Sequence, residues 1–442
     1  MQGDNGRTRF IAHVNGSRQT PKRAHLTSWG LWTAPKKAAV SRDVLLKEKA
    51  MEALLSHPIK HGRLTITAPD GQRHTLKGAM HGPEVSIKVT DSKVMRRMLV
   101  IPDLYLGEAY MDGSLVIEDG RLYDVLDFFA LNLMPRLHDP NATVLPSSFH
   151  NNVVGRAKDN VAFHYDLSRR LFELFLDRDL QYSCAYFRSH DDTLEQAQSN
   201  KKKRIAAKLL LEPGMRVLDI GSGFGGLALH LARTHGVDVV GLTLSEEQWR
   251  VAQERAKAAG LEQKITFKLL DYRQETGRFD RIVSVGMFEH VGRAHYDEFF
   301  RKLGELLHDD GVCVLHSIGR MAPPGATSPW LIKYIFPGGY VPSLSETLAA
   351  IERTGLWVTD LEILRLHYAE TLKHWHRRFQ DNREKVRALY DERFCRMWEF
   401  YLQLCEIGYR RLNWMNFQAQ IAKRVGSVPL TRTYLTGWSE AG

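Results

Sequence analysis

The chain has 442 residues, of which 43% are hydrophobic and 25% charged, an ordinary composition for a folded protein of two or three domains. Its four cysteines lack the paired spacing of a zinc site or a disulfide framework, so we expect no metal and a reducing compartment. No apolar run approaches the ~18–20 residues of a membrane span, and the N-terminus lacks the apolar core of a signal peptide.

The net charge of +10 is concentrated in two segments. Residues 1–50 carry ten Lys and Arg against three Asp and Glu, and residues 371–424 carry twelve against six. A basic surface attracts polyanions such as nucleic acid or anionic lipid headgroups. Charge alone does not choose between these partners and a basic segment that is merely solvated.

Composition and periodicity divide the chain into four parts. Residues 1–41 are basic and rich in Gly, Pro, Ser and Thr, which predicts a partly disordered segment. Residues 42–140 predict a small α+β domain. Residues 141–152 predict a linker, because the stretch from His138 to Asn152 has two prolines and three asparagines. Residues 153–442 alternate helical patterns with short apolar strands, which predicts an α/β domain with a doubly wound, mostly parallel sheet.

Individual elements follow from hydrophobic spacing. In the first domain we expect helices at 43–57 and 122–133 and strand patterns at 62–71, 84–90 and 110–120, with Asp70-Gly71 as a turn. In the second domain we expect strands at 216–220, 237–242, 265–270, 281–285 and 311–318. Residues 369–424 are predicted to be mainly helical. Residues 319–344 predict an inserted lid or acyl-facing loop with exposed aromatic side chains at Trp330, Tyr334, Phe336 and Tyr340, although such aromatic residues often form only a local core.

The most informative feature is the turn after the strand at 216–220. The spacing Gly221-x-Gly223-x-Gly225 differs from the dinucleotide fingerprint G-x-G-x-x-G. Glycines allow a tight turn and close approach of the backbone to a ligand, and the helix that follows offers unpaired N–H groups. With Asp219 ahead of the first glycine, the turn fits an adenosyl amino acid better than a pyrophosphate.

Motifs along the second domain resemble the cyclopropane-fatty-acyl-phospholipid synthase family, including its mycolic acid cyclopropane synthase relatives. The resemblance covers about residues 155–425 and extends more loosely to 60–140, which resembles that family's lipid-binding N-terminal domain. The motifs that carry it lie at 160–167, 171–177, 181–187, 241–248, 271–273, 279–292, 315–319 and 367–375.

The resemblance implies transfer of a methylene group from S-adenosylmethionine to a cis double bond in a phospholipid acyl chain. It implies a carbocation on the chain and a bound bicarbonate as the base that removes a proton. The bicarbonate ligands implied by the motif match are Cys184, Glu289, His316, Ile318 and Tyr368. Cys405 falls where the family is described as having an active-site cysteine. Taken singly, each of these could be an ordinary core residue.

The resemblance also implies the residues that hold the cofactor. They come from three parts of the second domain: Tyr182 and Ser183; Asp219, Gly221, Ser222, Gly223 and Gly225; and Thr243, Ser245, Gln248, Asp271 and Tyr272. Hydroxyl and amide groups at 243–248 replace the acidic residue that many Rossmann-type sites place after the second strand. Ser245 could equally be a helix N-cap, in a capping box with Gln248.

As partners, the resemblance implies an unsaturated phospholipid and peripheral contact of a bacterial, cytoplasmic enzyme with the inner face of the cell membrane, and it suggests a homodimer. Two alternatives share the cofactor: methyl- or methylene-branched acyl chains, and methylation of a small amine. A third is a non-enzymatic scaffold or nucleic-acid binder. Its basic run, Lys201-Lys-Lys-Arg204, is short and predicted to be solvated, so we expect no nucleic acid partner.

Overall fold

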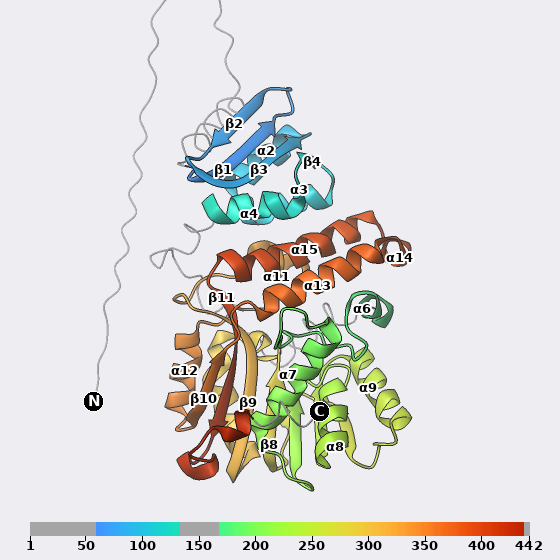
Figure 1. The fold of residues 1–442 in the computed structure, drawn as a ribbon, viewed down its shortest axis with the longest axis vertical. Helices are drawn as coiled ribbons and strands as arrows, with labels where there is room; N and C mark the ends of the chain where they lie inside the picture. Colours follow the sequence, from blue (N-terminus) through green and yellow to red (C-terminus); the bar gives the residue numbers. More distant parts are fainter. Residues whose placement is uncertain (1–58, 133–167, 437–442) are drawn as a thin grey trace, which may run out of the picture. The chain divides into compact units, whose positions relative to one another are not determined.

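The computed structural model describes residues 59–132 and 168–436. The basic segment predicted at 1–41, the helix predicted at 43–57 and the linker predicted at 141–152 lie outside the described residues. The domain boundaries predicted near residues 42, 140 and 153 lie outside them as well. The described residues form two sheets, one in each predicted domain (Figure 1).

The first sheet has four strands in the order β2-β1-β3-β4. Its strands are β1 His61–Thr67, β2 Arg73–Lys77, β3 Met80–Val89 and β4 Leu115–Asp119. Strand β1 pairs antiparallel with β2 and parallel with β3, and β3 pairs antiparallel with β4. The helices of this part are α2 Ser92–Val100, α3 Pro102–Met111 and α4 Leu122–Asn132. Helix α4 packs on β1 and β3, where the alternating buried side chains of the strands form a core.

Two predictions for this sheet need correction. Asp70-Gly71 does lie in a turn, but the turn leads into β2, a strand that we did not predict, rather than into β3. The strand pattern predicted at 110–120 was wrong in its first half, because Tyr110 and Met111 end helix α3. Gly113 then adopts a φ of 75°, which turns the chain before β4 begins at Leu115.

The second sheet has seven strands in the order β10-β11-β9-β8-β5-β6-β7. Its strands are β5 Arg216–Ile220, β6 Asp238–Thr243, β7 Ile265–Leu269, β8 Phe279–Val285, β9 Leu307–Arg320, β10 Trp357–Ile363 and β11 Trp414–Ala422. The five from β5 to β9 pair in parallel, and they confirm the five strands predicted there. The two C-terminal strands add antiparallel pairs at one edge.

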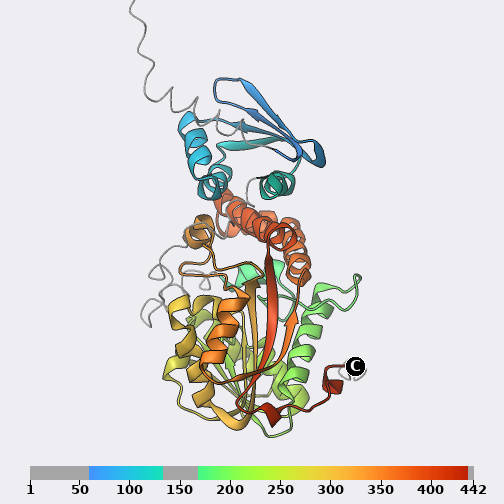
Figure 2. The same ribbon diagram turned by 90° about the vertical axis from the view of Figure 1, so that its left-hand side faces the viewer.

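Helices cover both faces of this sheet. The helices of residues 168–436 are α6 Arg169–Phe175, α7 Leu194–Leu209, α8 Gly226–His235, α9 Glu246–Ala258, α10 Tyr296–Leu306, α11 Pro329–Tyr334, α12 Leu344–Arg353, α13 His367–Asp381, α14 Arg383–Leu389 and α15 Glu392–Arg411. Short 3₁₀ turns lie at Tyr272–Gln274, Phe288–His290, Arg293–His295, Val425–Ser427 and Thr433–Leu435. Figure 2 shows the green helices α7 and α8 on one side of the strands and the yellow and orange helices α10 and α12 on the other. The domain is therefore a doubly wound α/β fold, as predicted.

Residues 369–424 are mainly helical, as predicted, but the segment ends in a strand that we did not predict. Helices α13, α14 and α15 fill most of the segment, but it closes with strand β11. In β11 the polar Asn416, Gln418 and Gln420 alternate with apolar residues, and nearly every residue is buried. The polar residues recur with a period of two, which indicates a strand, and both faces of β11 are buried.

The aromatic residues of segment 319–344 are less exposed than predicted. Trp330 and Tyr340 are fully buried, so their predicted exposure was wrong, and Tyr334 and Phe336 are partly buried. Trp330 lies on the short helix α11 against Phe400 of α15, with ring centroids 4.6 Å apart. The segment is thus anchored by aromatic packing.

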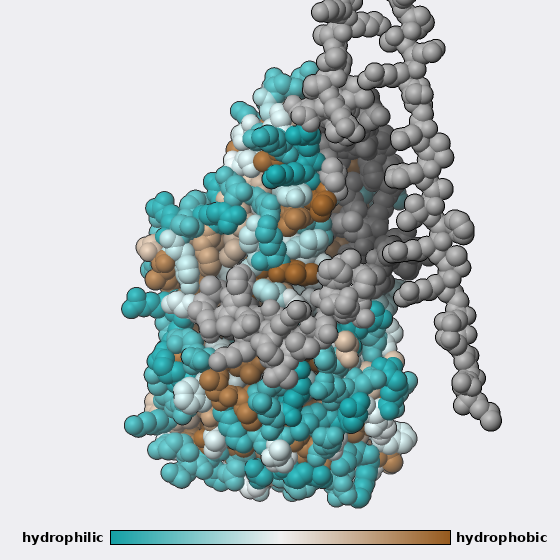
Figure 3. Space-filling view, turned by 180° about the vertical axis from the view of Figure 1, so that it is seen from behind, coloured by the Kyte–Doolittle hydropathy of each residue, from teal (hydrophilic) through white to brown (hydrophobic). Residues whose placement is uncertain are grey.

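Helix α15 also contacts the elements of the four-stranded sheet. Its Arg411 bonds Asp127 of α4 at 2.6 Å, and its Glu399 accepts a hydrogen bond from the Tyr110 hydroxyl of α3 at 3.0 Å. Within residues 59–132 and 168–436, no helix has the length and apolar character needed to cross a membrane. On the face shown in Figure 3, hydrophilic side chains predominate and the apolar ones form scattered patches.

Candidate active site

The glycine turn lies where parallel strand β5 ends and helix α8 begins. Gly221 has a φ of 84° and Gly225, the N-cap of α8, a φ of 79°. A Cβ atom at Gly221 would lie 2.8 Å from the Cβ of Met287, closer than side chains tolerate. The turn therefore needs glycine for both conformation and space, and it opens the carboxyl edge of the sheet as a ligand site.

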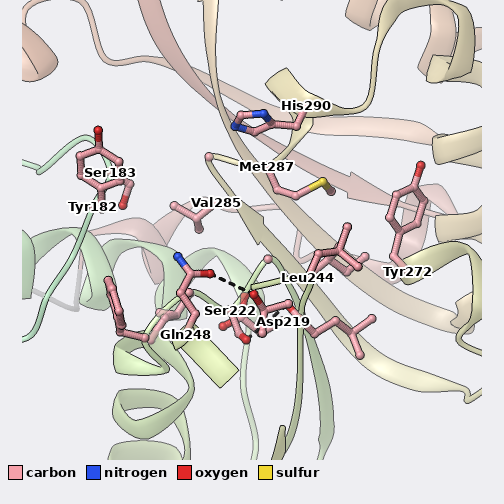
Figure 4. A pocket seen from close by; sticks show the side chains of 18 of the residues that line it. Tyr182, Ser183, Asp219, Ser222, Leu244, Gln248, Tyr272, Val285, Met287 and His290 are labelled. Carbon is pink, nitrogen blue, oxygen red and sulfur yellow. Dashed lines mark hydrogen bonds between the residues drawn. The ribbon is translucent and has the colours of Figure 1, made fainter. Parts of the chain in front are cut away.

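A cavity at this edge, which we call the outer cavity, collects most of the residues predicted to hold a cofactor (Figure 4). Those that line it are Tyr182, Ser183, Asp219, Gly221, Ser222, Gly223, Thr243, Gln248, Asp271 and Tyr272. Gly225 and Ser245 are not among its lining residues. Apolar groups of Leu244, Val285 and Met287 complete the wall, so the cavity offers polar contacts within an apolar surround.

Gly225 and Ser245 are the N-cap residues of the helices that follow β5 and β6. Ser245 is buried at the N-cap of α9, and its Oγ accepts a hydrogen bond from the Gln248 amide at 3.2 Å. The Gln248 side chain turns instead to Thr243, whose hydroxyl donates to Gln248 Oε1 at 2.9 Å. The side-chain nitrogen of Gln248, Nε2, is thus left as a donor at the outer cavity. Ser245 thus supports the site through the cap that the sequence also suggested.

Asp219 has a carboxylate suited to a cationic ligand. Its side chain is buried at the end of β5, and Oδ2 has no hydrogen-bond partner among the described residues. Burial raises the pKa of Asp219 to about 7, which the positive charge of Lys201 only partly offsets. An orphan carboxyl group in a cavity wall needs a donor or a positive charge from a ligand.

Asp271 instead finds its partner within its own turn. Its carboxylate bonds Arg273, with Oδ2 to Nη2 at 2.7 Å and Oδ1 to Nε at 2.9 Å. The arginine also lies over the ring of Tyr272, with 5.6 Å between its guanidinium carbon and the ring centroid. This cluster fixes Tyr272 in the wall of the outer cavity, where its flat ring offers a stacking surface.

Lys201 is a buried site residue that the sequence reasoning misjudged. We predicted the basic run 201–204 to be solvated, but Lys201 is only 1% exposed. Its ammonium donates to Gln181 Oε1 and to Ser183 Oγ, both at 2.7 Å. Both acceptors line the outer cavity. Burial lowers the pKa of Lys201 to about 8. No linear motif signals this contact, because it depends on how α7 packs against the loop before it.

A second cavity, which we call the inner cavity, collects all six residues predicted to be catalytic. They come from five places in the chain: the loop before α7, the 3₁₀ turn after β8, strand β9, helix α13 and helix α15. The residues are Cys184, Glu289, His316, Ile318, Tyr368 and Cys405. Strand pairing explains part of this, because His316 is in register with Val285, the last residue of β8, and Glu289 follows shortly after.

Glu289 is held by one carboxylate oxygen only. Its Oε1 accepts a hydrogen bond from the Ile318 amide at 2.6 Å, whereas Oε2 is buried with no partner among the described residues. Burial raises the pKa of Glu289 to about 7, although the Ile318 amide and the Ser317 hydroxyl act in the opposite direction. The amide of Ile318, predicted to face the anion, is therefore bonded to Glu289 here.

His316 shows the same half-satisfied pattern. Its Nδ1 lies 3.1 Å from the Gln418 side-chain nitrogen, and its Nε2 is buried without a partner among the described residues. Burial, followed by the charges of Lys201 and Lys208, lowers the pKa of His316 to about 3. The ring is therefore neutral at physiological pH.

The cysteines and tyrosine of the set are uncharged. Burial raises the pKa values of the Cys184 and Cys405 thiols and of the Tyr368 hydroxyl far above their usual range. The Cys405 side chain lies on α15 in the wall of the inner cavity, where a thiolate is not favoured. Packing and shape, rather than nucleophilic attack, are the roles that this environment supports for it.

Sequence reasoning did not find several other polar residues of the inner cavity. Thr327, Tyr409 and Asn416 line it, and each has a buried polar side-chain atom with no partner among the described residues. The two cavities also share Tyr182, Ser183, Gly286 and His290 as wall residues. A group bound in one cavity is thus adjacent to the other. Within the described part of the chain, no cluster of His, Cys, Asp or Glu has a metal-binding arrangement.

Comparison with known proteins identifies the family. Residues 154–419 match the family described as mycolic acid cyclopropane synthetase. The chain belongs to this family. A cyclopropane-fatty-acyl-phospholipid synthase of Escherichia coli K12 is 39% identical over 335 residues, which are 73% of this chain and 84% of the relative. A probable fatty acid methyltransferase of Pseudomonas putida is 37% identical over 372 residues, which are 82% of this chain and 92% of the relative.

A solved structure gives the same assignment. The mycolic acid cyclopropane synthase CmaA1, complexed with SAH and CTAB, matches with a TM-score of 0.57 and 35% identity, over 60% of this chain and 97% of that one. The chain is therefore an S-adenosylmethionine-dependent methyltransferase of the cyclopropane synthase family. The outer cavity fits this cofactor, since the orphan carboxylate of Asp219 and the glycine turn suit a cationic adenosyl amino acid.

The contacts of Lys201 give a testable consequence for cofactor binding. Lys201→Met removes the donor shared by Gln181 and Ser183, so we expect the Kd for S-adenosylhomocysteine to rise by ~10-fold, the value of one hydrogen bond to a charged group. Isothermal titration calorimetry measures the change. Lys203→Met on the same helix, at a partly exposed position, is the control and should leave the Kd unchanged. Equal Kd values for both variants would contradict the role given to Lys201.

Proposed function

We propose that the protein transfers a methylene group from S-adenosylmethionine to the cis double bond of an unsaturated acyl chain in a membrane phospholipid, which forms a cyclopropane ring. The observation that carries the proposal is the inner cavity, where orphan polar atoms of Glu289 and His316 lie within a largely apolar and aromatic wall beside the cofactor cavity. The name of the Escherichia coli relative supports phospholipid as the substrate.

The inner cavity suits a reaction that places positive charge on an apolar chain. Methyl transfer to an alkene leaves a carbocation, which water would trap in an open site. The aromatic residues of the wall are Tyr182, Phe336, Tyr340, Tyr368, Tyr401, Tyr409 and Trp414. Their ring faces would stabilise the cation through their quadrupoles, and their bulk would exclude water. Trp375 stacks on Tyr182 with centroids 5.1 Å apart and holds that ring in place.

We further propose that Glu289, His316 and Tyr368, with the amides of Cys184 and Ile318, hold a bicarbonate ion. The orphan atoms fit this ion, because His316 Nε2 can donate to an anion and Glu289 Oε2 can accept from its hydroxyl. When bound, bicarbonate would accept the proton that the methylated chain loses on ring closure. The Ile318 amide is shared, since it already bonds Glu289 Oε1.

A branched acyl chain is a second possible product, and the same assay would detect it. The Pseudomonas putida relative is named a probable fatty acid methyltransferase and covers more of the chain than the Escherichia coli relative does. A methyl-branched alkene would arise from the same cation by loss of a proton from a neighbouring chain carbon. A methylene branch would arise by a 1,2-hydride shift that moves the cation to the methyl-bearing carbon, followed by loss of a proton from the methyl group. Neither relative is named for an amine substrate, so we place amine methylation behind both lipid products.

The remaining parts of the proposal concern the membrane. We propose that the four-stranded sheet and its helices form the lipid-binding domain of residues 42–140, and that the protein docks on the cytoplasmic face of the membrane by its basic charge and shallow apolar contacts. A homodimer is part of the same proposal. The net charge of +10 supports attraction to anionic lipid, and its screening by salt should weaken docking.

The direct test is incubation of the protein with S-adenosylmethionine, bicarbonate and vesicles of dioleoyl phosphatidylglycerol and phosphatidylethanolamine. We expect mass spectrometry of the released acyl chains to show a gain of one CH₂ that resists mild catalytic hydrogenation, as a ring does. A gain of CH₂ that hydrogenation reduces would support methylene branching instead. Vesicles of saturated lipid are the control, and no gain on either lipid would contradict the proposed function.

Glu289 gives the second test. Glu289→Gln should slow turnover by ~10²–10⁴-fold, because it removes the acceptor that orients the base, while the Kd for S-adenosylhomocysteine stays nearly unchanged. The raised pKa means that Glu289 is ionised only above about 7, so wild-type activity at constant bicarbonate should fall as the pH drops through 7. The variant should lack this limb. Equal losses of turnover and cofactor affinity would show that Glu289 has been assigned wrongly.

A further inference from the structure

Gln418 faces His316 from the neighbouring strand, outside the set of residues that line the inner cavity. The two residues are in register between β11 and β9, and both are fully buried. The side-chain nitrogen of Gln418 lies 3.1 Å from Nδ1 of His316. No other hydrogen bond to the ring is found in the described residues, so Gln418 is the group that can select its tautomer.

In the orientation of the structure, the Gln418 amide places its nitrogen at the ring, and its own Oε1 is buried with no partner among the described residues. An amide N–H donates, so Nδ1 of His316 must accept and is unprotonated, and the proton of a neutral ring then sits on Nε2. Nε2 is the nitrogen that lacks a protein partner, on a residue that lines the inner cavity. If the amide were reversed, its oxygen would accept from Nδ1–H and leave Nε2 without a proton.

A fixed tautomer matters here because the ring does not acquire a charge. The charged and titratable groups with the largest influence on its pKa are Lys201 and Lys208 of α7, Glu362 of β10 and His367 of α13. The titratable groups that line the inner cavity with it are Glu289, His290, Tyr182, Tyr340, Tyr368, Tyr401, Tyr409, Cys184 and Cys405. Burial is the largest influence and lowers the pKa of His316 to about 3, so a donor at Nε2 cannot come from protonating the ring. An anion beside a neutral histidine needs the Nε2–H tautomer, and a bare Nε2 would repel it.

We propose that Gln418 is a positioning residue that holds His316 in the Nε2–H tautomer, and thereby makes the inner cavity a receptor for a small oxyanion. The inference rests on the proposed function for the identity of that anion, which is bicarbonate. It goes beyond the proposed ligand set, because Gln418 acts through His316 and not on the ion itself.

The tautomer can be read without measuring activity. In the ¹⁵N-histidine-labelled full-length protein with S-adenosylhomocysteine bound, His316 is assigned by comparison with His316→Gln. We expect nitrogen shifts of a protonated Nε2 and an unprotonated Nδ1 in the wild type, and a shift toward exchange between tautomers in Gln418→Met. A wild-type ring protonated on Nδ1, or a ring unchanged by Gln418→Met, would overturn the inference.

Kinetics supply the functional readout, with a matched control on the same strand. Gln418→Met should raise the apparent KM for bicarbonate by ~10-fold, as expected for one lost hydrogen bond to a charged group, and leave the Kd for S-adenosylhomocysteine unchanged. Gln420→Met removes a buried amide two residues away that donates to the Lys208 carbonyl at 2.6 Å instead. It should lower the Tm without changing that KM. Similar KM values in the two variants would contradict a specific role for Gln418.

Gln418→Glu separates positioning from simple packing. A carboxylate accepts from Nδ1–H, so it favours the doubly protonated ring and raises the pKa of His316. Nε2 then donates at low pH and loses its proton as the pH rises through that raised pKa. At constant bicarbonate we expect activity to fall with rising pH in the variant but not in the wild type. An unchanged pH profile would count against the inference.

The two proposals can fail separately. If wild-type turnover is independent of bicarbonate, the proposed base is wrong, whereas the nitrogen shifts still decide whether Gln418 sets the tautomer. If turnover depends on bicarbonate but the His316 ring is protonated on Nδ1, the proposed function stands and the role of Gln418 does not.

Discussion

Glu289 and His316 face the inner cavity with one polar atom bonded to the protein and the other without a partner. The Ile318 amide donates to Glu289 Oε1, and the Gln418 side chain contacts His316 Nδ1, whereas Glu289 Oε2 and His316 Nε2 have no partner among the described residues. Leaving buried polar atoms unpaired costs about 1–3 kcal/mol each. A protein retains such a cost where a ligand removes it, and one acceptor beside one donor is the complement of a hydrogen-bonding anion such as bicarbonate.

The glycine turn and the inner cavity depend on each other through a shared wall. Tyr182, Ser183, Gly286 and His290 line both cavities, so the cofactor and the reacting chain can meet across them. Lys201 adds a buried positive charge behind Ser183 and holds it by a 2.7 Å hydrogen bond. In the proposed reaction, the polar end of the cofactor, the acyl chain and the base would meet around this loop, which Lys201 of α7 holds in place.

The sequence could predict the parts of this site whose signals lie within a few neighbouring residues. The glycine spacing gave the turn after β5, and apolar runs gave the five parallel strands, because both signals lie within a few residues. The resemblance to a known family gave Cys184, Glu289, His316, Ile318 and Tyr368, which the fold brings to one cavity. Residue spacing alone could not have grouped them, since they come from distant elements.

The sequence-based predictions that the structure corrected have identifiable reasons. Strand β11 was missed although its polar and apolar residues alternate as in a strand, because the helical pattern of the residues before it was extended over it. Lys201 was taken for a solvated residue because its partners, Gln181 and Ser183, lie on a loop whose position no local pattern reveals. Trp330 and Tyr340 were expected on the surface because their segment is rich in Pro and Gly, yet aromatic packing and burial anchor it.

A crystal structure of the protein with S-adenosylhomocysteine and bicarbonate tests most directly whether Glu289 and His316 bind an anion in the inner cavity. We expect planar trigonal density there, within hydrogen-bonding distance of His316 Nε2 and Glu289 Oε2. Ordered water alone at that place, or side chains of Glu289 and His316 turned to partners elsewhere in the protein, would contradict it.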